Sequence, residues 1–225
     1  MSTVFQAVED QRFRCLGLFY DWRDDRDDFA KRAVLEILQG DEPDSRASKP
    51  PDAVVVMMNP GSSMPLPGHE GRGSEGRLVP TKPDSVQRQI MRLMARVGWH
   101  HVRVVNLADV RAARSADLHA LIDGGADRQA LGSMFAGASV VAPGNAIDAG
   151  LVICAWGMDK RLAPYATQAQ QWLDEKRVRL VGMRAPAARF PAWRYPKPVG
   201  NWSMAVEWLE VVERQVREAS AAGTR

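Results

Sequence analysis

The stretch that decides the fold is AVVVMMNPGSS, residues 53–63. Residues 54–58 are all apolar and carry no charge, which predicts a strand that is buried on both faces of a sheet. We expect this strand to end at Asn59, because Pro60 cannot donate to a β-ladder and Gly61 permits a sharp turn. Ligands of open α/β sheets bind at this carboxyl edge. An isolated Asn-Pro-Gly is more often a plain turn, so the other segments must decide between the two interpretations.

The bulk composition is that of an ordinary globular protein, and we expect one domain over residues 1–225. The chain is 45% hydrophobic and 25% charged, which allows one substantial core. Thirty basic against 27 acidic residues leave a net charge of only +3, so polyanion binding would depend on local clusters. No apolar run has the length of a signal peptide or a membrane span, which predicts a cytoplasmic protein without membrane contact. Cys15 and Cys154 are expected to be reduced core residues.

The first 49 residues are predicted to form an N-terminal extension that contains a helix. Residues 13–22 indicate a short edge strand or an irregular lead-in. Residues 24–39 predict a helix ended by Gly40, because their apolar side chains recur at helical spacing. These side chains are Phe29, Ala33, Val34, Ile37 and Leu38.

Two further segments follow the opening strand. Residues 62–83 are rich in glycine and proline and predict a flexible surface loop, either a binding lid or a disordered insertion. A helix is then expected over residues 86–97, capped by Asp84 or Ser85 and stopped by Gly98. Arginines recur every four residues along this helix, at positions 88, 92 and 96. Such a stripe is usually a solvated face, but it could also lie along a phosphate backbone.

The remaining chain alternates strands with helices. Strands are predicted over 102–107, 151–156 and 178–181, and helices over 118–136 (weakly), 160–176 and 203–219. This order predicts an α/β fold of three layers, α/β/α, around a mostly four-stranded parallel sheet. Three of its strands end at Asn59, Asn106 and Gly157, so one site assembled from loops at a single edge is expected.

The usual catalytic constellations are missing from the sequence. It has no phosphate-binding glycine loop ending in Lys-Ser, no H-E-x-x-H and no G-x-S-x-G. His69 and His119 lack partners at metal-ligand spacing, so we expect neither a metal nor a cofactor. The predicted edge offers amides and backbone dipoles instead. Such groups suit a reaction in which a leaving group departs with its electrons while the protein holds a water molecule.

Five motifs carry a resemblance to a known family. They are MNPGSS at residues 58–63, DSVQR from Asp84, VVNLADVRA at 104–112, PGN at 143–145 and AWG at 155–157. Their order resembles the uracil-DNA glycosylase superfamily over about residues 50–200, most closely an uncharacterised prokaryotic branch. Tyr195-Pro-Lys197-Pro occupies the place of that superfamily's H-P-S-P loop, with tyrosine in place of histidine and lysine in place of serine.

The resemblance implies roles for individual residues. Asn59 would orient the attacking water on C1′ of the deoxyribose, and Asn106 would hydrogen-bond the edge of a flipped base. Tyr195 could donate to the leaving base, and Asp109 could stabilise a cationic sugar or read an amino group. Asn106 and Asp109 could instead simply bond their own loops.

Further residues complete the predicted site. Gly61, Ser62 and Trp193 are assigned to base binding. Contacts to DNA are assigned to Arg88, Arg111, Lys197 and Trp202. Tryptophans in such a region are more often core residues than stacking platforms.

The resulting hypothesis is a monomeric, monofunctional DNA glycosylase that hydrolyses the N-glycosidic bond of a damaged or modified base. A bulky modified pyrimidine of phage DNA is one candidate, which would make the activity a defence. No catalytic lysine is recognisable, so no lyase step is expected. The alternative is a non-catalytic module that binds a nucleotide or DNA on the same fold.

Overall fold

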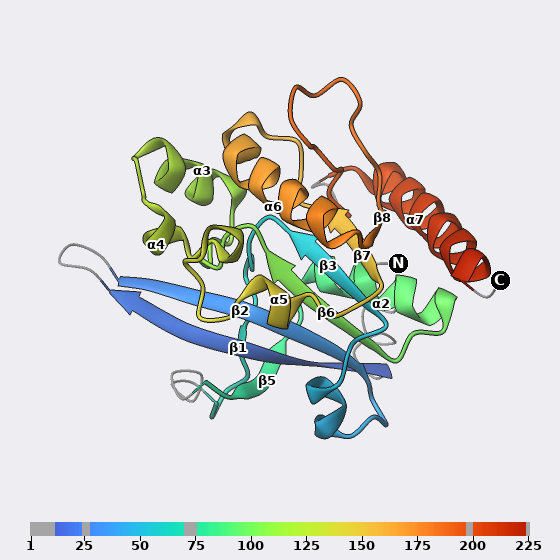
Figure 1. The fold of residues 1–225 in the computed structure, drawn as a ribbon. Coiled ribbons are helices and arrows are strands. Elements are labelled where there is room, and N and C mark those ends of the chain that lie inside the picture. The colour runs from blue at the N-terminus through green and yellow to red at the C-terminus, as the bar shows by residue number, and fades with distance from the viewer. Residues whose placement is uncertain (1–11, 24–27, 70–75, 197–199, 224–225) are drawn as a thin grey trace.

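The computed structural model describes residues 12–23, 28–69, 76–196 and 200–223. Within them an eight-stranded mixed sheet has the order β4-β5-β1-β2-β6-β3-β7-β8 (Figure 1). Its strands are β1 Phe13–Arg23, β2 Asp28–Gln39, β3 Ala53–Met57, β4 Met64–Pro65, β5 Leu78–Lys82, β6 His101–Asn106, β7 Leu151–Ala155 and β8 Arg179–Val181. The helices of the described residues are α2 Ser85–Val97, α3 Ser115–Asp123, α4 Arg128–Leu131, α5 Pro143–Ala146, α6 Ala163–Lys176 and α7 Trp202–Gly223. The protein is therefore an α/β protein.

The parallel half of the sheet contains the strands expected from the sequence. β3 pairs in parallel with both β6 and β7, and β7 pairs in parallel with β8. Met57 lies opposite Asn106 on one side and Ala155 on the other. The turn after β3, the end of β6 and the loop after β7 consequently leave the sheet at one edge, as predicted.

The sheet is wider than the predicted four strands, because the N-terminal region adds to it. The helix predicted over residues 24–39 is wrong: residues 28–39 form β2, which pairs antiparallel with β1 and with β6. β1 is not an edge strand either, since it lies between β2 and β5. The region predicted as an extension with a helix is thus a long β-hairpin within the main sheet.

A β-bulge explains why β2 resembles a helix in sequence. Val34 lies opposite Leu18 and Arg32 lies opposite Phe19, so Ala33 is an extra residue in β2. A bulge places two successive residues on one face and breaks the alternation of side chains. Both faces of the strand are also covered, so residues 31–38 are all buried. Without alternation, the spacing of the apolar residues imitates a helix.

The predicted loop over residues 62–83 is partly structured. β5 pairs antiparallel with β1, and β4 pairs antiparallel with β5. The sequence Leu-Val-Pro-Thr-Lys contains a proline that hides the strand, but prolines are tolerated near sheet edges. The flexible loop predicted over the whole segment is therefore wrong for residues 78–82; residues 70–75 lie outside the described part of the chain.

Helix α2 begins and ends where the sequence predicted. Asp84 accepts hydrogen bonds from the backbone nitrogens of Val86 and Gln87, and the Gln87 side chain accepts from the Asp84 nitrogen at 2.8 Å. This reciprocal pair is a capping box. Gly98 ends the helix in the left-handed conformation, with φ of 77°.

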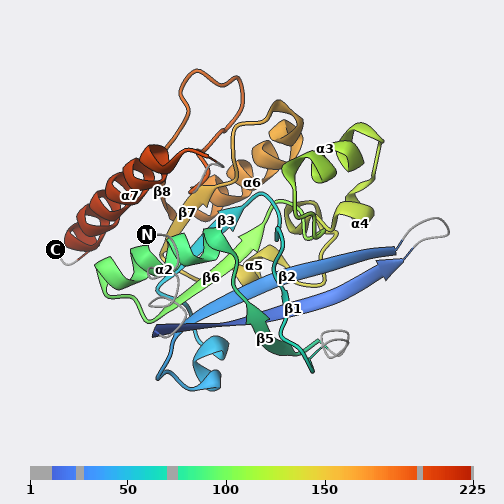
Figure 2. The ribbon, with the colours of Figure 1, turned by 180° about the vertical axis from the view of Figure 1, so that it is seen from behind.

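Helices cover both faces of the parallel strands. α2 and α7 lie on one face of the sheet (Figure 2). There Ile90 and Trp208 belong to one buried cluster with Val55 and Val104. α3 and α6 pack on the other face. There Leu118 and Ala166 cluster with strand residues that point away from α2, such as Val56. In the described residues no helix is both long and apolar enough to cross a membrane.

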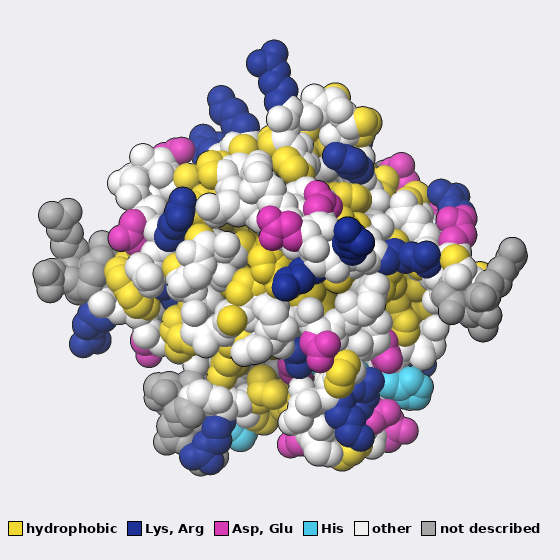
Figure 3. All heavy atoms as spheres, viewed as in Figure 1, with side chains coloured by type: hydrophobic (Ala, Val, Ile, Leu, Met, Phe, Trp, Pro, Cys, Tyr) yellow, Lys and Arg dark blue, Asp and Glu magenta, His cyan; other side chains and the backbone are white. Residues whose placement is uncertain are grey.

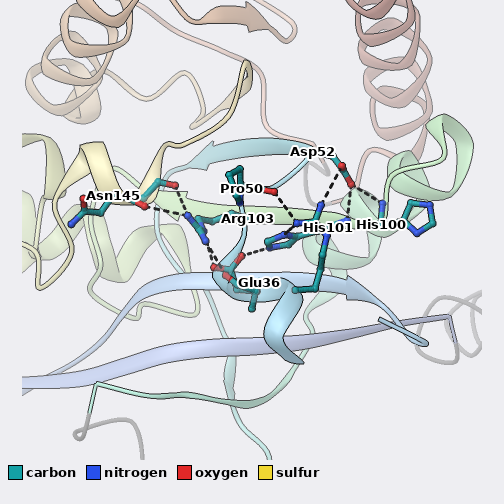
Figure 4. A network of polar contacts seen from close by, with 10 residues as sticks. Glu36, Pro50, Asp52, His100, His101, Arg103 and Asn145 are labelled. Atoms are coloured by element: carbon teal, nitrogen blue, oxygen red, sulfur yellow. Dashed lines mark hydrogen bonds and ion pairs between the residues drawn. The ribbon is translucent and has the colours of Figure 1, made fainter. Parts of the chain in front are cut away.

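A buried ionic network ties the hairpin to the amino end of β6 (Figure 4). Glu36 of β2 is 2% exposed. Its Oε2 atom lies 2.7 Å from Nε2 of His101, and its Oε1 atom accepts a hydrogen bond of 2.7 Å from Nε of Arg103. Asp52 accepts from the backbone nitrogens of His100 and His101. Because buried charges need partners, this network holds β2 against β6 at the edge opposite the predicted site.

Candidate functional site

The Asn59 turn lies at the carboxyl edge, and its side chain is anchored. Asn59 is 3% exposed and its Nδ2 atom donates a hydrogen bond of 2.8 Å to the carbonyl of Ala112. This bond joins the turn to the loop that follows β6 and orients the amide. No described residue donates a hydrogen bond to its Oδ1 atom, so this atom is the acceptor that the turn offers to a ligand or a water molecule.

Asn106 ends the neighbouring strand with an amide that has no partner. Its side chain is 0% exposed, and neither Nδ2 nor Oδ1 has a hydrogen-bond partner among the described residues. Val104, two residues earlier on β6, packs with α2 and α7, so Asn106 faces the same side of the sheet. A buried amide without partners is costly, because it loses its hydrogen bonds to water without replacement.

Arg32 is a third polar group near this edge, and no sequence motif points to it. It is 1% exposed, and its Nε and Nη1 atoms have no hydrogen-bond partner. Burial lowers the pKa of Arg32 to about 10, while Asp84 and Cys15 act in the opposite direction. Because Lys31 bonds the carbonyl of Gln129 on the α4 side, Arg32 faces the α2 side with Asp84.

Asp84 and Gly61 bring the α2 cap against the Asn-Pro-Gly turn. Gly61 has φ of 65°, and a Cβ atom built on it would lie 3.0 Å from Oδ2 of Asp84. The same carboxylate caps α2 through Oδ1. The approach of this negative charge to the turn requires a glycine, in addition to the positive φ.

Tyr195 reaches the same region from the loop between β8 and α7. It packs against the core clusters of both sheet faces. Burial raises the pKa of its phenol well above the usual range, and the charge of Asp84 raises it further whereas Arg32 lowers it. The hydroxyl is therefore protonated at neutral pH and can donate a hydrogen bond. Lys197 of the same loop lies outside the described residues.

Asp109 belongs to a second cluster, which faces α4. Its Oδ2 accepts hydrogen bonds from Tyr20 at 2.8 Å and Ser139 at 2.5 Å, whereas Oδ1 has no partner. Burial raises the pKa of Asp109 to about 7, against the opposing effect of Lys31. Lys31 is itself 1% exposed, and burial lowers its pKa to about 8. Burial therefore shifts the pKa of this acid upward and the pKa of this base downward, so that the two values approach each other.

The remaining base-binding candidates differ in exposure. Ser62 is exposed at the turn, whereas the hydroxyl of Ser63 beside it is buried without a partner. Trp193 is only 7% exposed and packs edge-on against Trp156, with ring centroids 6.2 Å apart. Its nitrogen donates to Gln170 at 3.3 Å. Trp193 thus packs in the core, the alternative that the sequence left open for it.

The DNA-binding candidates divide into anchored and exposed groups. Arg111 donates from Nε to the carbonyl of Ser63 at 2.8 Å and lies over the ring of Phe19, so it holds the turn in place. Trp202 begins α7 and is 62% exposed, with the Arg92 guanidinium 5.8 Å from its ring centroid. Arg88 lies two turns earlier than Arg96, which pairs with Glu213 of α7 at 3.1 Å. Arg92 and Arg96 therefore lie beside α7, whereas Arg88 lines a hollow together with Arg14 of β1 and Lys82 of β5.

Charges on the visible surface are mixed. On the face shown in Figure 3, Lys and Arg side chains alternate with Asp and Glu, and basic groups project over the loop between β8 and α7 at the top of the view. No group of three or more His, Cys, Asp and Glu side chains in the described residues could hold a metal ion. The polar groups that the described residues present near the edge are amides, Arg32, a tyrosine hydroxyl and carboxylates.

Unpartnered polar atoms lie near the carboxyl edge on both faces of the sheet, with Arg32 and Asn106 on the α2 side and Asp109 on the α4 side. The described residues contain nine buried side-chain nitrogen or oxygen atoms without a partner, and six of them belong to Arg32, Ser63, Asn106 and Asp109. Folded proteins satisfy almost all such atoms, so a concentration of exceptions indicates a ligand or ordered water.

Comparison of the chain with models of protein families, with curated proteins and with solved structures finds no match.

Proposed function

We propose that the protein is a monofunctional DNA glycosylase that flips a damaged or modified base and hydrolyses its N-glycosidic bond, on a three-layer fold like that of uracil-DNA glycosylases. The observation that carries this proposal is the amide of Asn106, buried at the carboxyl edge with neither of its polar atoms bonded. An amide offers one acceptor and two donors, which suits the edge of a base taken out of the stack.

The turn of β3 supplies the water-holding group. With Nδ2 bonded to Ala112, the amide of Asn59 presents Oδ1 as an acceptor for a water proton. An amide oxygen is too weak a base to deprotonate water, so the glycosidic bond breaks first and the base leaves with the electron pair. Water then adds to C1′ of the cationic sugar, and its proton is released.

Two acidic groups support the remaining steps. Tyr195 keeps its proton, because burial raises the pKa of its phenol, and it can donate to the departing base. Asp109 lies in the cluster that faces α4, so we propose that it acts on the sugar only through its charge when the carboxyl group is ionised. Contacts to DNA away from the flipped base are proposed for Trp202 and Arg88, and for Lys197 beyond the described residues. We propose a cytoplasmic monomer as the working form.

A screen of modified DNA tests the proposal. Single- and double-stranded oligonucleotides containing uracil, other deaminated bases or phage-type modified pyrimidines are incubated with the protein. Abasic sites are measured by alkaline cleavage, and free base is measured by chromatography. We expect one class of substrate to release its base without strand cleavage before alkali. Absence of abasic sites on every substrate contradicts the enzyme proposal.

Asparagine variants test the residue assignments. Asn59→Ala should abolish base release while circular dichroism shows a folded protein, and Asn106→Ala should reduce it. Asn145→Ala is the matched control, because the side chain of Asn145 is exposed and its described bonds all use the backbone, whose nitrogen donates to Ala142 and whose carbonyl accepts from Arg103. Base release that survives in Asn59→Ala removes Asn59 from the mechanism.

The second candidate is a non-catalytic module that binds a nucleotide or DNA. The bond between Asn59 and Ala112 favours it, because that bond gives Asn59 a structural role without any reaction. A gel-shift assay paired with measurement of free base separates the candidates. The module predicts salt-dependent binding and no base release.

A further inference from the structure

Arg32 is a buried cation, and two of its three side-chain nitrogens have no hydrogen-bond partner among the described residues. Its Nε and Nη1 atoms lack partners although the side chain is 1% exposed. A charge in this position costs several kcal/mol unless it is paired and hydrogen-bonded. The charges of two carboxylates, Asp84 and Asp109, act on Arg32. Asp84 caps α2 through its Oδ1 atom, and Asp109 accepts a hydrogen bond from Tyr20 through its Oδ2 atom. The guanidinium therefore has donors to offer to a ligand.

Arg32 and Asn106 lie on adjacent strands and face the same side of the sheet. β2 pairs with β6 up to Leu35, which lies opposite Val104. Further along, the backbone nitrogen of Arg32 donates a hydrogen bond of 2.9 Å to the backbone carbonyl of Asp109. Asn106 lies between these two points on the chain. The bulge at Ala33 turns Arg32 toward the α2 side, which Asn106 also faces. The charges of Asp84 and Tyr195, which belong to the loops of the candidate site, raise the pKa of Arg32, in agreement with this orientation.

The free atoms define a hydrogen-bonding pattern. Arg32 contributes donors only, whereas Asn106 contributes a donor and an acceptor. A matching ligand edge must therefore carry several acceptors and at most one or two donors. A keto oxygen beside an imide N–H fits this pattern, whereas an exocyclic amino group places a donor against a donor. Asp84 and Asp109 balance the positive charge nearby, which disfavours a free anion relative to a neutral acceptor.

We propose that Arg32 binds keto oxygens of the base whose edge Asn106 reads, and thereby makes the site select oxo-substituted over amino-substituted bases. The identity of the ligand as a base rests on the proposed function. In the reaction, the electron pair of the broken C1′–N bond leaves on the base and spreads to its keto oxygens, where the charge of Arg32 stabilises it. Water adds to C1′, and the base accepts the proton that the water releases.

Binding of free bases tests the inference without requiring excision. Saturation-transfer NMR measures uracil, cytosine and inorganic phosphate binding to the wild-type protein and to Arg32→Met, Arg32→Lys and the surface control Arg114→Met. The wild type and Arg114→Met should bind uracil more tightly than cytosine. Arg32→Met should weaken uracil binding about tenfold and remove the preference, as expected for loss of a paired base contact. Arg32→Lys keeps the charge and should retain part of the affinity.

Folding of the variants is checked by circular dichroism and thermal unfolding. Arg32→Met should be at least as stable as the wild type, because it replaces an unpaired buried charge by an apolar chain. If Arg32→Met does not fold, the comparison of Arg32→Lys with the wild type decides: equal affinities and equal preference overturn the inference.

Three results overturn the inference: no uracil binding to the wild type, uracil binding unchanged in Arg32→Met, or Arg32-dependent binding of phosphate alone. The assay of abasic sites is independent. Selective uracil binding without base release on any DNA contradicts the glycosylase and leaves the inference standing. If base release is unchanged in Arg32→Met and the protein shows no preference among bases, the inference about Arg32 is contradicted and the glycosylase proposal stands.

Discussion

The hydroxyl of Tyr20 donates a hydrogen bond of 2.8 Å to Oδ2 of Asp109, a residue 89 positions further along the chain. The bond joins the N-terminal hairpin to the loop that follows β6. Because Asp109 is 0% exposed, its carboxyl group is held away from water, and burial raises its pKa to about 7. The hairpin thus contributes directly to the electrostatics of the candidate site.

This pKa predicts a pH-dependent stability. An aspartate ordinarily titrates at 3.8, so between pH 4 and 7 the folded state binds more protons than the unfolded state. The contribution of Asp109 to stability is therefore lost as the pH rises through this window. Asp109→Asn should gain stability relative to the wild type, by at most about 4 kcal/mol between pH 4 and 8. Urea unfolding at both pH values measures the difference, and parallel pH profiles of the two proteins contradict the assignment.

Substitutions at two glycines with similar φ angles distinguish the cost of a left-handed backbone from the cost of a steric clash at Cβ. Gly61 and Gly98 have φ of 65° and 77°, but a Cβ atom on Gly61 meets Oδ2 of Asp84 at 3.0 Å whereas one on Gly98 meets nothing within 4 Å. Gly98→Ala should cost roughly 1 kcal/mol of stability for the left-handed conformation. Gly61→Ala should cost more stability, and under the proposed function it should also lower base release. Equal losses of stability in chemical denaturation would show that the approach of Asp84 is unimportant.

The parallel core and its site edge are predictable because their signals are local. β3 is a continuous apolar run that ends at a proline, and α2 carries its cap at Asp84 and its stop at Gly98. Strands that alternate with helices form a parallel sheet, so these local signals suffice to place Asn59 and Asn106 at one edge. Their chemical roles remain predictions.

The hairpin could not be predicted in the same way, because its pattern results from tertiary contacts. The bulge at Ala33 and the burial of both faces of β2 remove the alternation that identifies a strand. Misassigning β2 also concealed Lys31 and Arg32, since a charged pair on a predicted helix indicates a solvated face. Two successive charges within an otherwise apolar segment were the available signal. The Arg32 side chain could be linked to Asn106 only through the register of β2 with β6.

The Glu36 network predicts a large loss of stability at the edge away from the candidate site. Glu36→Ala leaves His101 and Arg103 without their buried partner, and should lower the free energy of unfolding by about 3–5 kcal/mol. Glu36→Gln keeps the shape and should lose less. The exposed pair of Arg114 with Asp117 is the control, and Asp117→Ala should unfold like the wild type. A small effect of Glu36→Ala in urea denaturation would mean that water replaces the carboxylate.

Two tryptophans at the carboxyl side predict opposite phenotypes. Trp193 is 7% exposed and stacks edge-on with Trp156, so Trp193→Ala should cost about 3–5 kcal/mol of stability. Trp202 is 62% exposed, so Trp202→Ala should change stability by less than about 0.5 kcal/mol.

If Trp202 stacks on a base, the same change should weaken DNA binding by about 1–3 kcal/mol, measured by fluorescence anisotropy. Trp202→Phe keeps an aromatic face and should retain most of the affinity. The salt dependence should be the same in all three proteins, because no charge is removed. Unchanged affinity in Trp202→Ala would exclude Trp202 from the DNA-binding surface, while a loss shared by Trp202→Phe would indicate that indole packing against Arg92 matters instead of stacking.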